Sequence, residues 1–190
     1  MTKMTPNSRP TLRRVAALCS ALSGLTLAAA GSARADTARR EIQGDYRRFT
    51  AAETTLQYGR IRKAAASFFS PSFTLYTPSG KALSYAQFLT EMKVVTTENR
   101  AVKEDAFDTQ TMTRRGNALT ETGVYVFSRT FLDVDQDFGA KGLPHSLSER
   151  THYRGEWAKT GGHWTLQSLR LSGRTQIVDG KKFVAAKKRG

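Results

Sequence analysis

A carboxylate and a tyrosine alternate along one predicted strand, residues 146–159, and acid–base chemistry uses these residue types. Two-residue periodicity puts Glu149 and Tyr153 on the same face, together with a tryptophan. An inward carboxylate is costly unless it is paired or hydrated, so Glu149 is the best acidic candidate for the mouth of a pocket. The simpler alternative is an ion pair between Glu149 and Arg129 or Arg170.

Aromatic residues on the other apolar faces extend this candidate site. Ligand pockets are mostly apolar and carry few polar groups, but the same stripes also fit an ordinary packed core. For Tyr46 we favour packing, because a buried tyrosine needs only one partner for its hydroxyl. We commit to no catalytic residue, and Glu149, Tyr46 and Tyr153 are the weak candidates. The predicted pocket comprises Tyr46, Tyr76, Tyr125, Phe127, Arg129, Glu149 and Tyr153.

The sequence offers little basis for a metal or a cofactor. His145, His152 and His163 show no ligand spacing, and a catalytic zinc site needs three protein ligands. The acidic segment 133–139 lacks the glycine and glutamate that a calcium loop requires, which leaves only weak calcium binding open. Glycine-rich phosphate loops and nucleophile elbows are absent from the sequence. We therefore expect no metal and no cofactor.

Three helices are predicted to support the site. Apolar residues recur at helical spacing over residues 38–57, and Glu53 is the only polar residue on that stripe. A second helix, 60–69, ends before a proline. Ser84 followed three residues later by glutamine is a capping box, which opens a helix over 85–95.

The remaining elements are predicted strands. A β-rich segment at 72–77 precedes a Pro-Ser-Gly turn, and from residue 101 onward the pattern is alternating throughout. Regular turns between neighbouring strands indicate an antiparallel meander, so the fold class is α+β with helices on one sheet face. The later strands are expected at 102–113, 118–132, 146–159 and 163–172.

The order and spacing of these segments resemble the nuclear transport factor 2-like superfamily, in particular its secreted SnoaL-like branch. Residues 69–80, 83–89, 150–157 and 161–166 carry the resemblance, which covers about 38–173. It implies a cone in which a curved antiparallel sheet wraps a long N-terminal helix and leaves a pocket. Ketosteroid isomerase-like members place a base carboxylate just before the Pro-x-Gly turn.

That position is Thr77 here, and a threonine hydroxyl does not ionise near neutral pH. We therefore lean towards a protein that is not an enzyme. The leading hypothesis is a domain that binds a small, partly apolar ligand or a partner protein, with a homodimer through the sheet as one option. The alternative is an isomerase, cyclase or dehydratase that uses Glu149 with Tyr46 or Tyr153.

Charge is unevenly distributed along the 190 residues, whose formal net charge is +14. An excess of this size is typical of nucleic-acid binders. However, residues 1–35 hold five of the basic residues and residues 181–190 another five, so residues 36–180 carry only about +4. Those charges are spread over the segment. We therefore expect no nucleic-acid partner, and we interpret 36–180 as the folded domain and 181–190 as a flexible basic tail.

Residues 1–35 have the pattern of a cleaved export signal. A basic start precedes the apolar run 15–30, and small residues at Ala33 and Ala35 predict cleavage after Ala35. The paired arginines Arg13 and Arg14 leave the twin-arginine route open, although the general secretory route fits better. We expect a periplasmic or secreted mature chain that has no transmembrane span and no cysteine.

Overall fold

The computed structural model describes residues 36–133 and 142–183. The chain divides into two compact units, Met1–Ala38 and Arg39–Gly190, and the second unit holds the fold. The predicted export signal and most of the acidic segment lie outside the described residues. Among the residues that are described, no helix combines the length and apolar character needed to cross a membrane.

The first helix runs to residue 53, four residues short of the predicted end. Thr54 and Thr55 turn their hydroxyl groups back onto backbone carbonyls three residues earlier, which competes with continuation of the helix. Leu56 then adopts a left-handed φ of 53° and redirects the chain. The second helix, α2 (Tyr58–Phe68), follows directly.

Helix α3 (Tyr85–Glu98) begins as predicted. The Ser84 side chain accepts a hydrogen bond from the Gln87 backbone N–H, and the Gln87 side chain accepts one from the Ser84 backbone N–H. The predicted capping box is therefore confirmed. Before this helix, strand β1 (Phe69–Tyr76) and the short strand β2 (Ala82–Ser84) form a hairpin.

Seven strands form one sheet in the order β2-β1-β6-β5-β4-β3, and β7 pairs with β6. The predicted antiparallel meander is confirmed for β3 to β6, while β1 pairs with β6 in parallel. The strands that follow α3 are β3 (Asn99–Arg115), β4 (Ala118–Leu132), β5 (Pro144–Thr160), β6 (His163–Val178) and β7 (Lys181–Phe183). Strand β7 extends the sheet three residues into the predicted tail.

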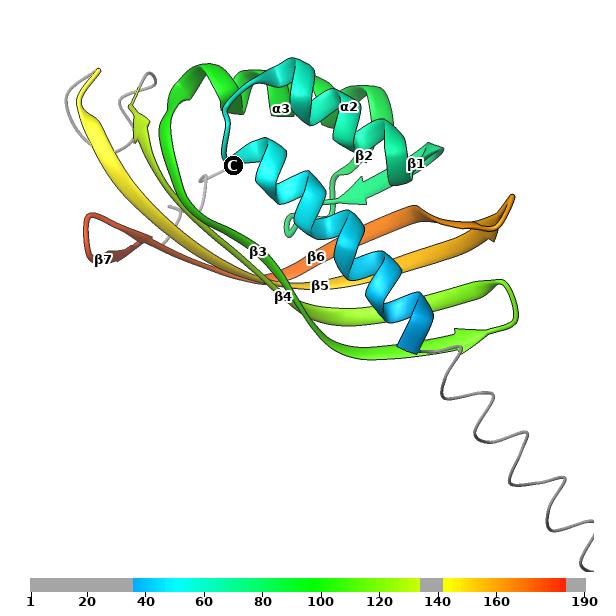
Figure 1. Cartoon of the computed structure of the whole chain (residues 1–190). Coiled ribbons are helices and arrows are strands. Elements are labelled where there is room, and N and C mark those ends of the chain that lie inside the picture. The colour runs from blue at the N-terminus through cyan, green and yellow to red at the C-terminus, as the bar shows by residue number, and fades with distance from the viewer. Residues whose placement is uncertain (1–35, 134–141, 184–190) are drawn as a thin grey trace, which may run out of the picture. The chain divides into compact units, whose positions relative to one another are not determined.

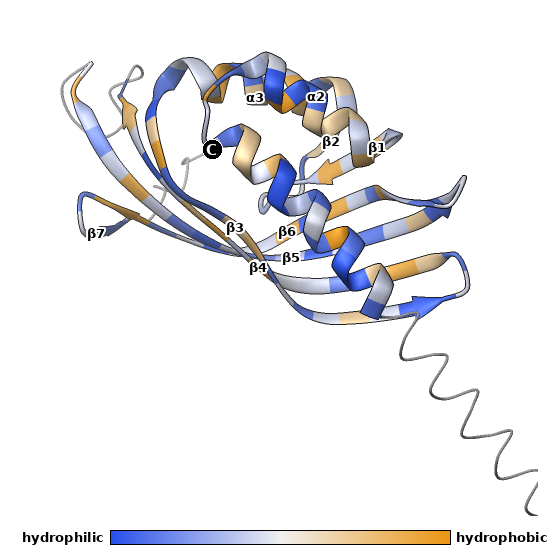
Figure 2. Cartoon of the chain, viewed as in Figure 1, coloured by the Kyte–Doolittle hydropathy of each residue, from blue (hydrophilic) through white to orange (hydrophobic). Residues whose placement is uncertain are grey.

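The long strands curve strongly, and the helices lie on the concave side of the sheet (Figure 1). Register shifts interrupt the β3–β4 and β5–β6 ladders, and such bulges bend a strand. Apolar and polar residues alternate along the strands, as Figure 2 shows. The fold is thus the predicted α+β arrangement of a curved sheet around the first helix, with a core of aromatic side chains between them.

Aromatic side chains join the first helix to the sheet. The Tyr46 ring stacks on Phe107 of β3 at 4.1 Å between centroids. Trp157 of β5 packs edge-on against Tyr46 at 5.5 Å. Helix and sheet therefore meet through large aromatic rings, which pack face to face and edge to face.

Candidate functional site

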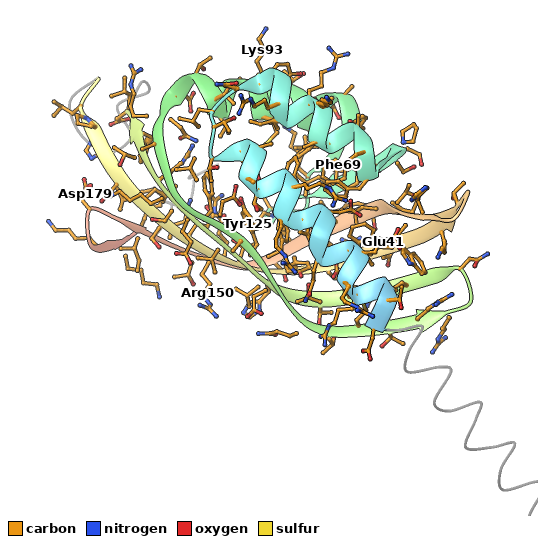
Figure 3. All side chains as sticks on the ribbon, viewed as in Figure 1. Glu41, Phe69, Lys93, Tyr125, Arg150 and Asp179 are labelled. Atoms are coloured by element: carbon orange, nitrogen blue, oxygen red, sulfur yellow. The ribbon has the colours of Figure 1, made fainter. Side chains whose placement is uncertain are left out.

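An aromatic cavity of about 110 Å³ lies between the first helix, α3 and the sheet. Five phenylalanines, one tyrosine and four aliphatic side chains form most of its wall, and a single carboxyl group completes it. Figure 3 shows Tyr125 between the first helix and the sheet. The lining residues are Phe49, Glu53, Phe69, Phe73, Leu75, Phe88, Met92, Phe107, Tyr125, Leu169 and Leu171.

The cavity wall is held in place by ring-to-ring contacts. Phe69 packs on Phe73 at 4.4 Å and edge-on against Phe88 at 5.3 Å. On the opposite side, Phe107 packs on Tyr125 at 4.6 Å. Interlocked aromatic pairs are stiff, so the cavity is built into the fold and does not depend on a loop closing over it.

Two carboxyl groups meet at the edge of this cavity. Glu53, the last residue of the first helix, is 8% exposed, and its Oε2 atom is buried without a hydrogen-bond partner among the described residues. Both carboxyl oxygens of Asp105, on β3, are likewise buried without a well-formed hydrogen bond among the described residues. Native proteins satisfy most buried polar atoms, so three unsatisfied carboxyl oxygens in one place call for an explanation.

Burial dominates the electrostatics of this pair. It raises the pKa of Glu53 well above the usual value, and the neighbouring Asp105 carboxyl raises it further. The position at the C-terminal end of a helix also disfavours a negative charge. Burial raises the pKa of Asp105 to about 6, although hydrogen bonds with the Glu53 and Tyr125 side chains act to lower it. The electrostatics therefore favour a proton on Glu53 over one on Asp105.

A groove of about 290 Å³ reaches Asp105 from the other side. It runs between the first helix and β3, and Arg47, Thr50 and Asp108 are among the residues that line it. Glu53 lines the aromatic cavity, whereas Asp105 lines the groove. The carboxyl pair thus lies between an apolar interior and a polar groove.

A second buried carboxyl group, Glu121 of β4, contrasts with this pair. Glu121 is 0% exposed and accepts hydrogen bonds from the Tyr46 hydroxyl, from Trp157 Nε1 at 2.8 Å and from Thr109 Oγ1 at 3.2 Å. Thr109 in turn bonds the Tyr153 hydroxyl at 2.8 Å. Burial raises the pKa of Glu121, and its three donors oppose that rise. A fully bonded carboxylate of this kind is a structural element of the core.

Gly155 makes room for the Glu121 carboxylate. A Cβ atom at Gly155 would lie 2.8 Å from Glu121 Oε1 and 3.2 Å from Trp157 Nε1. A larger side chain on β5 would push the carboxylate away from its donors. The sequence in this part of the sheet is therefore organised around the Glu121 network.

Glu149, the leading acidic candidate from the sequence, is absent from the wall of the aromatic cavity. Its carboxylate pairs with Arg174 at 2.7 Å and accepts hydrogen bonds from Thr151 and Gln176 at 3.0 Å each. An ion pair was the expected alternative, but its partner is Arg174 of β6 in place of Arg129 or Arg170. The predicted enzyme site requires the Glu149 carboxylate as a base, but this carboxylate is already paired with Arg174 and hydrogen-bonded.

The predicted pocket residues are divided among different surroundings. Tyr125 lines the aromatic cavity and Phe127 a small crevice beside it. Tyr46 lines the groove, and its hydroxyl donates a hydrogen bond to Glu121. Tyr76 and Tyr153 lie outside the cavity wall: the Arg170 guanidinium covers the Tyr76 ring at 4.1 Å, and the Tyr153 hydroxyl bonds Thr109 Oγ1 at 2.8 Å.

Arg129 and Thr77 also have other roles. Arg129 donates to Asn99 Oδ1 and lies over the ring of Phe131 at 5.1 Å, and burial lowers its pKa. The Thr77 hydroxyl bonds Ser79 Oγ at 2.9 Å within the turn before β2. At the family's base position, therefore, the side chain is engaged in turn formation.

The histidines lie either on the surface or in structural contacts. His152 is exposed on the outer face of β5. His145, at the start of β5, is 9% exposed and its Nδ1 lies 2.6 Å from Asp179 Oδ2. Within residues 36–133 and 142–183, no group of three histidine, cysteine or acidic side chains is placed to hold a metal ion. The segment considered for calcium lies mostly outside these residues.

Sequence reasoning missed the Glu53–Asp105 pair, although signals for both residues were present. Glu53 is the only polar residue on the apolar stripe of the first helix, and a polar residue at such a position must be paired or functional. Asp105 alternates with Phe107 on the inward face of β3. Because the two residues are 52 positions apart, only the tertiary fold reveals that they meet.

No protein-family profile matches the chain, and no curated protein sequence matches it either. Solved structures do match. A nuclear transport factor 2-like superfamily protein from Salmonella enterica aligns with a TM-score of 0.53 at 14% identity, over 82% of this chain and 98% of its own. An NTF2-like protein from Cytophaga hutchinsonii aligns with a TM-score of 0.52 at 8% identity, over 71% and 97%.

A further similar structure is an NTF2-like family protein from Streptomyces avermitilis that is named a candidate dehydratase. It aligns with a TM-score of 0.52 at 13% identity, over 73% of this chain and 97% of its own. Identities this low establish the fold and leave the activity open. Together with the curved sheet, its meander and the first helix, these matches lead to one conclusion: the chain has the nuclear transport factor 2-like fold.

Proposed function

We propose that this protein binds a small, largely apolar molecule in the aromatic cavity, with Glu53 and Tyr125 as its polar contacts. The observation that carries the proposal is the cavity itself, a preformed space whose only polar lining groups lie together on one side. This arrangement is typical of ligand sites, in which an apolar wall gives affinity and a few polar groups give orientation.

The cavity volume sets the size of the ligand. An engineered cavity of about 150 Å³ holds benzene, so a space of about 110 Å³ suits a molecule of about five or six non-hydrogen atoms. Larger ligands would require the side chain of Met92 to move, and methionine is the most adaptable residue of the wall.

Filling the cavity tests this proposal. Cyclopentanol is titrated into the protein and into Leu171→Phe, and binding is followed by NMR shifts of the cavity aromatic residues. We expect saturable binding to the wild type and none to Leu171→Phe, because the added ring occupies the space. The volume-conserving variant Leu171→Met is the matched control and should still bind. Failure of cyclopentanol to perturb the cavity resonances would refute the proposal.

The Glu53–Asp105 pair supports a second candidate function, acid–base catalysis on the bound molecule. A carboxyl group whose pKa is raised to about 6 works near neutral pH, and a protonated neighbour can act as the acid. The candidate dehydratase from Streptomyces avermitilis has the same fold, and dehydration requires these two roles. In this proposal the Glu53–Asp105 pair takes the part first considered for Glu149.

Proton exchange on a bound ketone tests the catalytic proposal. Cyclopentanone is incubated with the protein in heavy water, and deuterium uptake at its α-carbons is measured by NMR. We expect uptake that Asp105→Asn abolishes and that the exposed control Asp108→Asn retains. Equal uptake with and without protein would refute catalysis while leaving ligand binding intact.

We also propose that residues 1–35 direct export and are removed after Ala35. The basic start, the apolar run and the small residues before the cleavage point support this proposal. Expression of the full chain in a bacterial host, with N-terminal sequencing of the periplasmic product, tests it. The expected sequence starts at Asp36, and a cytoplasmic product that retains Met1 would refute it.

A further inference from the structure

The negative charge of the Glu53–Asp105 pair, at the edge of the aromatic cavity, lacks a countercharge among the described residues. Neither Glu53 nor Asp105 forms an ion pair with any lysine, arginine or histidine in the described parts of the chain. Arg47, which lines the outer groove together with Asp105, is exposed. A buried carboxylate without a partner is costly, and a bound positive charge would offset that cost.

The unsatisfied atoms at this site are all acceptors. Oε2 of Glu53 and both oxygens of Asp105 lack a well-formed hydrogen bond among the described residues, although the Glu53 carboxyl and the Tyr125 hydroxyl lie beside Asp105, and each of these oxygens can accept a hydrogen bond. A ligand that supplies N–H donors would satisfy them. A ligand that offers only a carbonyl or a carboxylate would supply no donor, and a carboxylate would add a second negative charge.

The rest of the wall also suits a cation. Six aromatic rings surround the space, and the faces of such rings carry negative charge density that attracts ammonium groups. Phe107 and Tyr125 lie beside the carboxyl pair and pack on each other at 4.6 Å. Aromatic faces and a carboxylate thus converge on one small volume.

From this geometry we infer that the aromatic cavity selects a small organic cation, a protonated primary amine on a compact hydrocarbon body, over neutral or anionic molecules of the same size. The inference rests on the proposed ligand site and names its ligand class. The hydrocarbon body fills the space between the phenylalanines, and the ammonium group lies at Glu53. The cavity volume limits the ligand to about six non-hydrogen atoms.

Three probes of six non-hydrogen atoms each test the inference: cyclopentylamine, cyclopentanol and cyclopropanecarboxylate. Each is titrated into the protein at about pH 7.5, where the amine is protonated and the acid ionised. Desolvated cation–aromatic contacts and the carboxylate predict a Kd for the amine at least about tenfold below that of the alcohol. The carboxylate should not bind.

Asp105→Asn tests the source of the preference, because it removes the Asp105 carboxylate and leaves Glu53 in place. We expect the amine and the alcohol to bind Asp105→Asn about equally, and the control Asp108→Asn to keep the preference. Lowering the pH below 6 should reduce the preference in the wild type as Asp105 protonates. The groups that face Asp105 are Glu53, Tyr125 and the rim residue Arg47, and Tyr125 stays neutral throughout.

The wild-type titrations decide the inference even if a variant fails to fold. Tight binding of the alcohol with no preference for the amine would overturn the cation selectivity and leave the ligand site in place. Binding of the carboxylate as tightly as the amine would overturn it as well. Failure of all three probes to bind would overturn both the selectivity and the ligand site.

Discussion

Replacing Asp105 by asparagine should remove one cause of the loss of stability with rising pH at the carboxyl pair. Folding raises the pKa of Asp105 from 3.8 to about 6, so the folded protein holds a proton on this group more strongly than the unfolded chain does. The stabilisation from this proton is complete below about pH 4 and is lost as the pH rises through about 6. Asparagine is neutral at every pH, so Asp105→Asn does not lose stability in this way as the pH rises.

The magnitude follows from the size of the shift. A shift of about 2 pKa units at ~1.4 kcal/mol per unit corresponds to about 3 kcal/mol between the two ends of the pH range. The free energy of unfolding of Asp105→Asn should therefore improve by about 3 kcal/mol relative to the wild type between pH 4 and pH 7.5. Asp105 also raises the pKa of Glu53, so the difference between the two curves reports the Asp105 charge together with its effect on Glu53.

Urea titrations at several pH values measure this difference, with unfolding followed by tryptophan fluorescence. Asp108→Asn is the control, because Asp108 is exposed on the same strand. Its curve should stay parallel to that of the wild type. A difference between Asp105→Asn and the wild type that is constant from pH 4 to pH 7.5 would refute the reasoning, since it would mean that Asp105 titrates alike in the folded and unfolded states.

Three further substitutions test the parts of the fold that support the site, each by urea unfolding. Ser84→Ala removes the cap of α3 and should cost about 1 kcal/mol, whereas an unchanged midpoint would contradict the capping box. Tyr46→Phe leaves the Glu121 carboxylate with one donor fewer and should cost about 1–3 kcal/mol. Gly155→Ala should destabilise the protein and change the tryptophan fluorescence, because the new methyl group displaces the Glu121 carboxylate from Trp157; wild-type stability and spectrum would argue against that role.

Much of the fold could be predicted from the sequence because local signals determine it. The capping box at Ser84 and the alternation of residues 146–159 depend on neighbours along the chain, and both were predicted correctly. The end of the first helix was missed, because two threonine side chains compete there with the backbone. The parallel pairing of β1 with β6 was also missed, since it joins segments about a hundred residues apart.

The candidate site was harder to predict, because its character depends on which acids find partners. Glu149 and Glu121 both lie on inward faces, yet Arg174 neutralises one and three donors satisfy the other. Glu53 and Asp105 find neither a cation nor a set of donors among the described residues. Alternation along a strand indicates which acids point inward, but only the tertiary structure shows which of them remain unsatisfied.

The parallel pairing of β1 with β6 also determines when the aromatic cavity forms during folding. Strands β3 to β6 are joined by adjacent hairpins, whose contacts close short loops and form early. Phe73 and Leu75 of β1 meet Leu169 and Leu171 of β6 only after most of the chain has been synthesised. The cavity is therefore completed at a late stage, once β6 joins β1.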